Sequence, residues 1–484
     1  MPATAKAMST TSSNIKTRAS YGFSARRAFC TKLGLEELHH EDGHEHMQSS
    51  IAFDAHNHIH LSREGGIPPL SSNEMMLASR GLRGQPRLNE VENTSDVEGD
   101  TIDLTLHAHK ILDALRIQGV YRGATSSVDA DADADENNAE EQFNFQLGGI
   151  ALMSTQPRDF PIVKNLSDAI LHLSQKDIDE KEKTDYSDDD VGTHSTMEVV
   201  RNYGVHPWFL RQAQSDFAGI RYRETAFTTD VTNTTPTWLP YLKQKLESDP
   251  LAHVGEIGLD GARYEIDPDT NEKTLVSTME SQIEAFEAQM HLAADMNRSV
   301  SLHAVRCWGP LMDSLRRLKG TRSKMRKETR IERKKLKREL ELCNEEGGSS
   351  NADIFESYRQ IDEDVLLFPR KIYFHAFGGK AALVDQLDAI CRDKSSESSA
   401  TSKNAVETFY GFAPVVNFRS HKTAAIVRKV GINRLVLETD VEDYARVNAD
   451  LKSSIEYIAE ALEMEEEEVL RHTRNNARRL YGLT

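Results

Sequence analysis

The chain has 484 residues, which is enough to bury a large core, and one enlarged (β/α) barrel would use most of that length. Its hydrophobic content of 38% and charged content of 28% are typical of a soluble globular protein with polar insertions. No apolar run is long enough to span a bilayer, which argues against a membrane protein. The formal net charge of −18 argues against a protein that coats nucleic acid with its whole surface, although a local basic patch remains compatible with it.

Cysteine usage and the composition of the first residues bear on the compartment. The cysteines are scattered at Cys30, Cys307, Cys343 and Cys391 without a Cys-x-x-Cys pair, which predicts reduced thiols inside the cell. The first 35 residues contain no Asp or Glu, carry six Lys or Arg and are rich in Ser, Thr and Ala, like an organelle transit peptide. A disordered basic terminus has the same composition. The sequence therefore predicts a disordered segment 1–48 in a cytoplasmic or nuclear protein, with mitochondrion and plastid as alternatives.

The first predicted strand begins at Ile51 and leads into a histidine pair. Ile51 and Phe53 alternate with Asp54, His56 and His58, which is the two-residue period of a strand. Because side chains two residues apart project from the same face, His56 and His58 can bind one ion together, with Asp54 behind them as an orienting group. Two solvated histidines in a polar loop would explain most isolated His-x-His pairs, so the metal site depends on further ligands.

Strands and helices alternate along the rest of the chain. The predicted strands cover 147–154, 199–203, 252–255, 300–302, 371–374, 408–412 and 434–437. The predicted helices cover 104–117, 163–173, 239–246, 279–297, a basic stretch 316–338 and a final segment that ends near 482. Insertions interrupt this pattern near 62–100, 122–145, 175–197 and 316–365, and one of them contains the acidic run 129–142.

Most of these strands run into a residue that binds metal or transfers protons. In chain order, the residues that follow the apolar runs are His206, Glu256, His303, His375 and Asp440. Strands separated by helices predict an α/β fold with a parallel sheet. A polar residue at the end of strand after strand predicts a TIM-type (β/α) barrel whose site lies at the carboxyl ends of its strands. We therefore expect one barrel domain with long polar insertions over residues 49–484.

The candidate residues form a consistent set of metal ligands. Imidazole and carboxylate together suit Zn or Mn, and carboxylate-bridged sites also hold Mg. The set consists of His56, His58, Glu256, His303, His375 and Asp440. One carboxylate between two ions about 3.5–4 Å apart is the usual two-metal arrangement, which polarises an ester and lowers the pKa of a bound water. The set predicts ester hydrolysis, with Asp440 as a ligand that also takes the proton of the attacking water.

Seven short motifs occur in the order found in a known family. They are Asp54-x-His56-x-His58, Gly-Val-His206-Pro, Gly-Glu256-Ile-Gly-Leu-Asp260, Leu-His303, Phe-His375-x-Phe-Gly, Glu438-Thr-Asp440 and Asn476-Ala-Arg-Arg-Leu. From about Phe53 to Leu480, the chain resembles the TatD-related metal-dependent deoxyribonucleases, which are amidohydrolase-like barrels. The resemblance implies two divalent metal ions. It assigns His56, His58, Glu256 and Asp440 to one ion, assigns Glu256, His303 and His375 to the other, and places His206 against the substrate phosphate.

The sequence departs from the family's usual pattern at two places. The family usually has His-x-Arg after the fifth strand, whereas His303-Ala-Val-Arg306 shifts the arginine by one position. After the final Asp, the family usually has Ala-Pro and a cationic loop, whereas this chain has Val441-Glu442-Asp443-Tyr444. These departures resemble a eukaryotic side branch similar to fungal members that are partners of cell-cycle machinery. A protein partner is therefore expected beside a nucleic-acid substrate.

The resemblance and the ligand set together imply a deoxyribonuclease that acts on single strands or ends of DNA. Glu256 and Asp440 are the expected catalytic residues, and His206, Arg306 and Asp260 are expected to contact the substrate. One alternative is another ester, such as the one in D-aminoacyl-tRNA. A second alternative is a barrel kept as a protein-interaction module, which an intact ligand set disfavours. No feature of the sequence indicates an oligomeric state.

Two features of the sequence keep more than one interpretation. The segment 316–338 contains thirteen Lys or Arg against two Glu, which suits a solvated helix or an arm that binds DNA. Glu438 precedes Asp440 by two residues and therefore points the same way along the strand, where a structural hydrogen bond and a catalytic role are equally compatible with it.

Overall fold

The computed structural model describes residues 51–59, 108, 111–112, 145–184, 197–217, 236–266, 271, 273–345, 352–360, 365–392 and 405–483. All of them lie in one unit of the fold, Gln48–Thr484. The predicted segment 1–48, the loop 62–100 and the acidic run 129–142 lie outside the described residues. Within the predicted helix 104–117, Ala108, Ile111 and Leu112 are described, and these residues are helical and buried.

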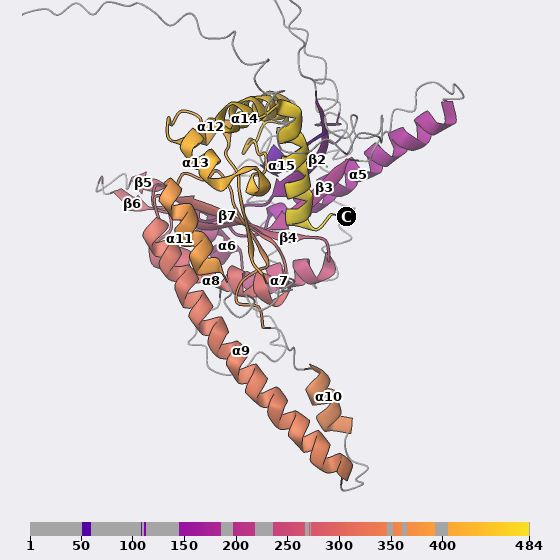
Figure 1. The fold of residues 1–484 in the computed structure, drawn as a ribbon, viewed down its shortest axis with the longest axis vertical. Coiled ribbons are helices and arrows are strands. Elements are labelled where there is room, and N and C mark those ends of the chain that lie inside the picture. Colours follow the sequence, from indigo (N-terminus) through magenta and orange to yellow (C-terminus); the bar gives the residue numbers. More distant parts are fainter. Residues whose placement is uncertain are drawn as a thin grey trace, which may run out of the picture. The chain divides into compact units, whose positions relative to one another are not determined.

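A parallel sheet forms the centre of the fold (Figure 1). Its seven strands are hydrogen-bonded in sequence order: β1 (Ile51–Asn57), β2 (Gln146–Met153), β3 (Glu198–Tyr203), β4 (His253–Asp260), β7 (Val300–Val305), β8 (Lys371–Phe374) and β9 (Glu407–Tyr410). Every pair of neighbours is parallel. This order confirms the predicted α/β class, because consecutive parallel strands require a crossover helix between them.

Residues 435–441 close the sheet into a TIM-type barrel. On one side Leu435 bridges Tyr410 of β9. On the other side the Ala55 amide of β1 donates to the Leu437 carbonyl at 2.9 Å, and the His58 amide donates to the Val441 carbonyl at 2.9 Å. The segment occupies the position of the predicted strand 434–437, but its hydrogen bonds are too few for a regular strand. At Asp440 it turns into the left-handed region, with φ of 56°.

Helices cover the outside of the barrel. The longer ones are α5 (Asp159–Thr184), α7 (Leu239–Ser248), α8 (Met279–Asp295), α9 (Trp308–Glu345), α10 (Ala352–Gln360), α11 (Ala381–Cys391), α13 (Thr423–Val430), α14 (Val447–Leu462) and α15 (Glu466–Tyr481). Shorter elements are η2 (Pro207–Phe209), α6 (Leu210–Asp216), α12 (Pro414–Asn417), η4 (Ile432–Arg434) and η5 (Tyr444–Arg446). The apolar faces of these helices pack against the outer face of the sheet and form the main core, because each element must bury its apolar face against another.

A smaller apolar cluster fills the barrel interior, and α15 closes one end of it. Phe53, Tyr373 and Phe409 meet there with Leu480 and Tyr481 of α15. The Tyr481 hydroxyl donates to the Ala55 carbonyl at 2.8 Å. The Ser299 hydroxyl, next to the start of β7, donates to the Leu480 carbonyl at 2.7 Å. The helix therefore seals the amino-terminal end of the strands and leaves the carboxyl end for the candidate site.

Several elements differ in extent from their predictions. Helix α5 runs to Thr184, past the predicted end at 173, because the acidic segment that follows continues the helix. Strand β4 continues through Glu256 to Asp260, so Glu256 lies inside the strand and not after it. An antiparallel hairpin, β5 (Tyr264–Ile266) with β6 (Lys273–Leu275), follows β4 and was not predicted. Its strands are three residues long and largely exposed, so they carry no apolar period.

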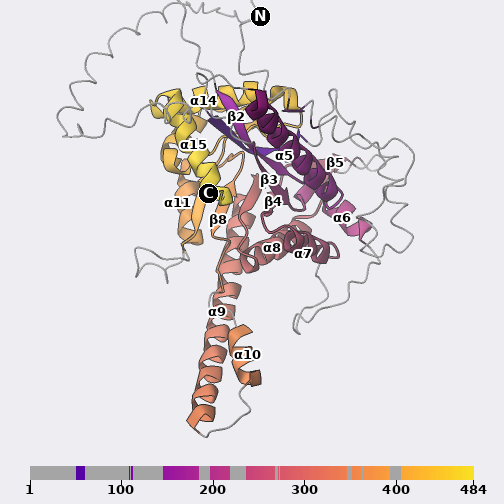
Figure 2. The same ribbon diagram turned by 90° about the vertical axis from the view of Figure 1, so that its right-hand side faces the viewer.

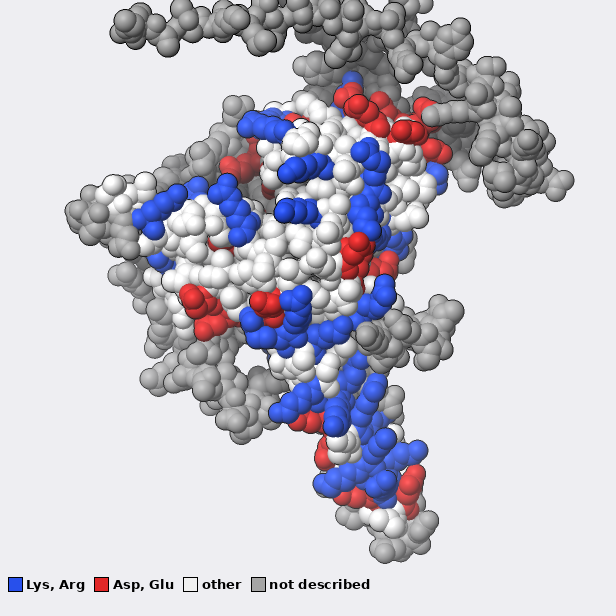
Figure 3. Space-filling model, turned by 60° about the vertical axis from the view of Figure 1, so that its left-hand side comes forward, with Lys and Arg blue, Asp and Glu red and all other residues white. Residues whose placement is uncertain are grey.

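The basic stretch belongs to a helix longer than predicted, which continues past the barrel (Figure 1, Figure 2). The buried guanidinium of Arg322 donates to the Leu366 carbonyl and to Asp295, and Arg326 donates to the Val365 carbonyl at 2.6 Å. Residues 365–366 lie a few residues before the start of β8 at Lys371, so α9 reaches the amino-terminal end of the sheet at this level. We call residues 327–345 of α9 together with α10 the basic arm. Lys and Arg side chains crowd it (Figure 3).

Among the helices of the described residues, none has the length and apolar character that crossing a membrane requires. The basic arm illustrates why, since α9 is long but carries charged side chains along most of its exposed surface.

Candidate metal centre

The barrel brings six predicted ligands together at the carboxyl ends of its strands. His56 comes from β1 and His58 directly follows that strand; Glu256 comes from β4, His303 from β7, His375 from the residue after β8 and Asp440 from the closing segment 435–441. All are buried except Asp440, whose side chain is 19% exposed. Elements separated by up to several hundred residues therefore converge on one point, as the barrel fold requires of its site.

Glu256 lies at the centre of the cluster, with one carboxylate oxygen toward each half. Its Oε1 lies 2.6 Å from His375 Nε2 and 2.8 Å from His303 Nδ1. Its Oε2 lies 3.1 Å from His58 Nε2 and 3.5 Å from His56 Nε2. A carboxylate with each oxygen facing a separate pair of imidazoles has the arrangement of a bridging ligand.

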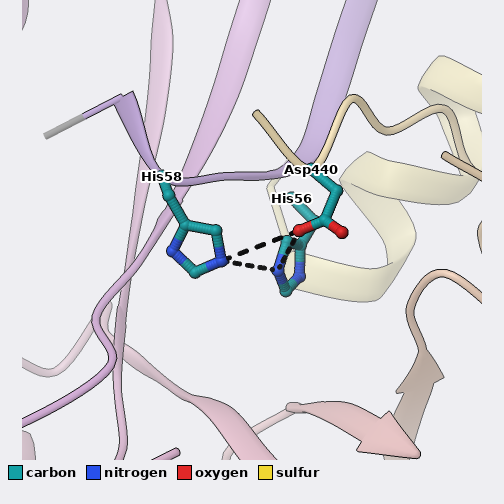
Figure 4. Close-up of side chains that lie close together, drawn as sticks. All are labelled: His56, His58 and Asp440. Carbon is teal, nitrogen blue, oxygen red and sulfur yellow. Dashed lines mark hydrogen bonds and ion pairs between the residues drawn. The ribbon is translucent and has the colours of Figure 1, made fainter. Parts of the chain in front are cut away.

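The half formed by His56, His58 and Asp440 has the donor set of a cation site (Figure 4). The two Nε2 atoms are 3.2 Å apart, and Asp440 Oδ1 lies 3.7 Å from His56 Nε2 and 3.8 Å from His58 Nε2. His58 Nδ1 donates to the Met153 carbonyl at 2.9 Å, so a neutral His58 presents the lone pair of Nε2 to the cluster. Lone pairs that converge in a buried site repel one another unless a proton or metal ion lies between them. The residues therefore fit a divalent cation.

Asp260 orients His303 in the other half of the cluster. Its Oδ2 accepts from His303 Nε2 at 3.0 Å, which leaves Nδ1 toward Glu256. A carboxylate that holds the remote nitrogen of an imidazole fixes the tautomer and raises the basicity of a metal-ligating histidine. Asp260 was predicted to contact the substrate. In the structure its side chain contacts His303, Trp208 and the backbone of residues 262–263.

His206 lies beside Glu256 but differs from the other histidines in its hydrogen bonding. Its Nδ1 accepts from the Trp208 amide at 3.2 Å, so in the neutral ring the proton lies on Nε2. Nε2 is 3.4 Å from Glu256 Oε1. Burial lowers the pKa of His206 to about 4, which favours the neutral ring. A neutral imidazole with a proton on the inward nitrogen suits donation to a substrate oxygen better than metal ligation.

The electrostatics of the cluster follow from burial and mutual contact. Burial raises the pKa of Glu256, but His375 and His206 outweigh it, and the pKa falls well below its ordinary value. Burial lowers the pKa of His58, but the hydrogen bond and charge of Glu256 raise it to about 9. The same balance, with Asp260 added, raises the pKa of His303 to about 9. Without a metal ion, protons therefore occupy positions in which cations can replace them.

Two further acids lie close to the ligands. Asp54 accepts from the Thr439 hydroxyl at 2.7 Å and from the Thr439 amide at 3.1 Å, which ties β1 to the closing segment. Burial raises the pKa of Asp54 to about 7. Glu438 accepts from the Tyr373 hydroxyl and from the Ala376 amide, and burial raises its pKa well above the ordinary value. The side chains of Asp54 and Glu438 therefore accept hydrogen bonds from other parts of the chain and connect the closing segment to β1 and β8.

The second glycine of the Gly-Glu256-Ile-Gly-Leu-Asp260 motif, Gly258, has a steric reason in the structure. Its φ is 153°, and a Cβ at this position would lie 1.9 Å from the His303 carbonyl oxygen. Strands β4 and β7 therefore approach closely where Glu256 and His303 meet, which a side chain would prevent.

Three further residues lie around the cluster: Arg306, which was predicted to bind the substrate, and Ser301 and Trp208, which were not predicted. Arg306 is exposed at the end of β7 and has φ of 52°. Ser301, whose hydroxyl is 3.0 Å from His56 Nδ1, was not predicted, although it precedes His303 by two residues and so shares its strand face. Trp208 was also missed, because an aromatic residue after His-Pro has no strand or helix period of its own. Its indole donates to Asp260 at 2.8 Å.

Comparison with known protein families gives a match over much of the chain. The model of the family "TatD related DNase" matches residues 190–482, which is more than half of the chain. The chain belongs to the TatD related DNase family. The match makes it a hydrolase of the TatD type and supports metal dependence in general terms.

Individual relatives of this TatD-family chain are distant. The Cut9-interacting protein scn1 of Schizosaccharomyces pombe is 23% identical over 357 residues, which cover 68% of this chain and 96% of scn1. A TatD homologue from Escherichia coli has 17% identity and a TM-score of 0.38, over 70% of this chain and 88% of its own. A TatD-family hydrolase from Entamoeba histolytica has 12% identity and a TM-score of 0.37, over 70% and 86%.

Proposed function

We propose that the chain is a metal-dependent deoxyribonuclease that hydrolyses phosphodiester bonds in single strands or at ends of DNA. The observation that carries the proposal is the position of Glu256, with one oxygen toward each of two imidazole pairs. His56, His58, Glu256 and Asp440 would hold one divalent ion, and Glu256, His303 and His375 would hold the second. Mg, Mn and Zn all suit this mixture of nitrogen and oxygen ligands.

Each residue of the site has a distinct task in this proposal. Divalent ions, when bound, supply Lewis-acid polarisation of the phosphodiester and lower the pKa of water. Asp440 is the ligand most open to solvent and accepts the proton of the attacking water. His206 Nε2 donates a hydrogen bond to a phosphate oxygen, and Arg306, exposed directly after β7, attracts the phosphate charge. Asp260 acts through His303, which it holds in the ligating orientation.

Elemental analysis combined with a cleavage assay tests the proposal. The purified protein should contain divalent metal, hydrolyse labelled single-stranded DNA, lose activity on chelation and regain it with Mg, Mn or Zn. Full activity after exhaustive chelation, with no residual metal by elemental analysis, would refute it.

A second ester is the nearest alternative substrate. Two acids, the exposed Glu442 and the following Asp443, come shortly after Asp440. A site that binds a phosphodiester would be expected to have cationic side chains there. An aminoacyl ester is neutral at its reacting carbon, so D-aminoacyl-tRNA suits this local charge. Side-by-side turnover of single-stranded DNA and D-aminoacyl-tRNA at equal enzyme and metal decides between them. Faster cleavage of D-aminoacyl-tRNA would make this ester the substrate in place of DNA and would leave the proposed metal centre unchanged.

We also propose that the chain has a protein partner inside the cell. The name of scn1 describes it as interacting with Cut9, and the alignment spans nearly all of scn1. Cys307, Cys343 and Cys391 are free thiols, which supports a reducing, cytoplasmic or nuclear setting. Direct binding between this chain and the counterpart of Cut9 from the same organism is the test. A protein that binds this counterpart but hydrolyses neither DNA nor D-aminoacyl-tRNA would favour the interaction module.

A further inference from the structure

An exposed tryptophan lies next to the metal centre. Trp208 is in η2, directly after His206 and Pro207, and is 36% exposed. Its indole Nε1 donates to Asp260 Oδ2 at 2.8 Å, and its ring centroid lies 4.9 Å from that of His206 and 6.0 Å from that of His303. By contrast, Trp238 is 1% exposed within the core. Trp208 is thus fixed in place by a buried acid while much of its surface faces the solvent.

Cations and aromatic rings alternate from Trp208 into the β5–β6 hairpin. The Arg263 guanidinium carbon lies 4.9 Å from the Trp208 ring centroid. The next residue, Tyr264, is 40% exposed, and the Lys273 ammonium lies 4.4 Å from its ring centroid. We call Trp208, Arg263, Tyr264 and Lys273 the aromatic track. In each pair a cation lies over an aromatic ring, and both rings are partly exposed to solvent.

The aromatic track is attached firmly to the metal centre. Asp260 Oδ1 accepts from the amides of Ala262 at 2.5 Å and Arg263 at 2.9 Å, while its Oδ2 binds His303 and Trp208. The Arg211 guanidinium of α6 contacts Glu265 in β5 and the Leu275 carbonyl in β6. One carboxylate therefore positions a proposed metal ligand, the indole and the start of the hairpin together. A preorganised surface of this kind loses little conformational entropy on binding.

We propose that the aromatic track binds a single strand of nucleic acid, with bases stacked on Trp208 and Tyr264 and phosphates paired with Arg263 and Lys273. The proposal rests on the phosphodiesterase function and names its substrate subsite. Aromatic rings interleaved with cations are the usual means of binding single strands, because every base offers a face for stacking and every linkage a negative charge. Bases in a duplex are stacked on each other and have no face to offer. The aromatic track therefore selects single strands.

Fluorescence anisotropy measures the proposed contact without turnover. The probe is a short fluorescein-labelled oligothymidylate with phosphorothioate linkages, which resist hydrolysis, added to the metal-loaded full chain. Trp208→Ala should weaken binding on the order of tenfold or more, as expected for the loss of one stacking ring. Trp208→Phe, which lacks the indole N–H but keeps a ring, should retain most of the affinity. Tyr264→Ala on the exposed hairpin should also weaken binding and serves as the test if Trp208→Ala does not fold.

A strand without bases separates stacking from an indirect structural effect. For an abasic phosphorothioate strand, wild type and Trp208→Ala should bind equally, because ring and base act as a coupled pair. Phe355→Ala, which removes an aromatic ring that is 49% exposed on α10, is the matched control and should bind like wild type. Equal binding of oligothymidylate by wild type, Trp208→Ala and Tyr264→Ala would overturn the proposal. So would an equal loss of affinity for the abasic strand.

Failure of the proposed function gives a different result. If the wild type with Mg, Mn or Zn hydrolyses no phosphodiester, the deoxyribonuclease proposal is refuted, whatever the anisotropy measurements show about binding. If the wild type cleaves DNA while the Trp208 and Tyr264 variants bind as it does, the aromatic track alone is refuted.

Discussion

The metal centre and the basic arm both gather ionisable side chains, but they do so in opposite ways. In the metal centre, buried groups converge on Glu256 at distances from 2.6 to 3.5 Å. In the basic arm, Lys335 and Lys337 are exposed and lie 3.8–3.9 Å from glutamates one turn away. Burial makes unpaired charge very costly, whereas exposed ion pairs contribute little. A converging buried cluster therefore demands a ligand, and an exposed helix with many charges does not.

The largest expected effect is at the point where the buried charges meet. Glu256→Gln keeps the shape of the side chain and removes its charge from both halves of the cluster. We expect hydrolysis to fall by on the order of 10² or more, as for loss of a preorganised electrostatic group. The fall should exceed that of His56→Ala or His375→Ala, each of which affects one ion.

Glu284→Gln, on the exposed face of α8, is the matched control for this change and should behave like wild type. Turnover and metal content by elemental analysis are measured together. A Glu256→Gln protein with two bound ions and near-normal turnover would show that Glu256 is not a bridge.

The pH dependence of metal binding gives the next effect. The pKa values of His58 and His303 are raised to about 9, so both rings hold protons at neutral pH in the metal-free protein. Metal binding must displace these protons. Affinity should therefore rise as pH approaches 9, by about tenfold per pH unit for each proton released.

Calorimetric titration with Zn in buffers of different ionisation enthalpy counts the protons directly. His58→Gln should release about one proton fewer than wild type. Metal affinity that is independent of pH between 7 and 8 would mean that the rings are already neutral in the metal-free protein.

Changing the exposed charges near the metal centre, at Arg306 and Glu442, should have moderate and opposite effects on the use of single-stranded DNA. Arg306→Ala removes a cation near the proposed phosphate and should lower kcat/KM for single-stranded DNA by several-fold, about 1 kcal/mol of lost attraction near the surface. Glu442→Lys adds a cation beyond Asp440 and should raise affinity by a similar factor. Glu247→Lys makes the same charge change at the exposed end of α7, just before the start of β4 and so at the opposite end of the strands, and is the control. Equal effects of the two Lys variants would show that only net charge matters.

The smallest effect is expected from the basic arm, despite its high charge. Replacing Lys327, Arg330, Lys334 and Arg338 by Gln neutralises cations that recur at helical spacing along α9. These residues lie beyond the amino-terminal edge of the sheet, opposite the metal centre, so cleavage of a short single strand should stay within about twofold. Binding is measured over a range of salt. A decrease in the slope of log K against log salt by about 0.7 per lost contact would show that the arm binds phosphates.

The residues of the candidate site could be predicted because each lies in an apolar strand or shortly after one and belongs to a short motif. His56 and His58 are two residues apart, and Glu256 lies in a run whose glycines have a steric reason in the structure. The resemblance to a family was also needed, since spacing alone does not assign ligands to two ions. The barrel followed from the same repetition, and its closing segment was found although it is not a regular strand.

Residues that act through tertiary contacts could not be predicted in their structural role. The contacts of Asp260 with His303 and Trp208 were not predicted, because these two residues lie on other elements. The β5–β6 hairpin has no apolar period because its strands are exposed. The burial of Arg322 was also missed, because an arginine in a basic stretch is expected at the surface, whereas this one is buried in the structure.

The seal formed by α15 has a consequence for how the protein is made. Strand β1 holds its ligands at the start of the barrel, but the segment beside it and the seal beneath it are residues 435–441 and α15. The ribosome must therefore release nearly the entire barrel before β1 finds its second neighbour. Contacts between such distant residues slow folding and expose sheet edges meanwhile. We expect nascent chains that stop before 435 to depend on chaperones and to bind no metal.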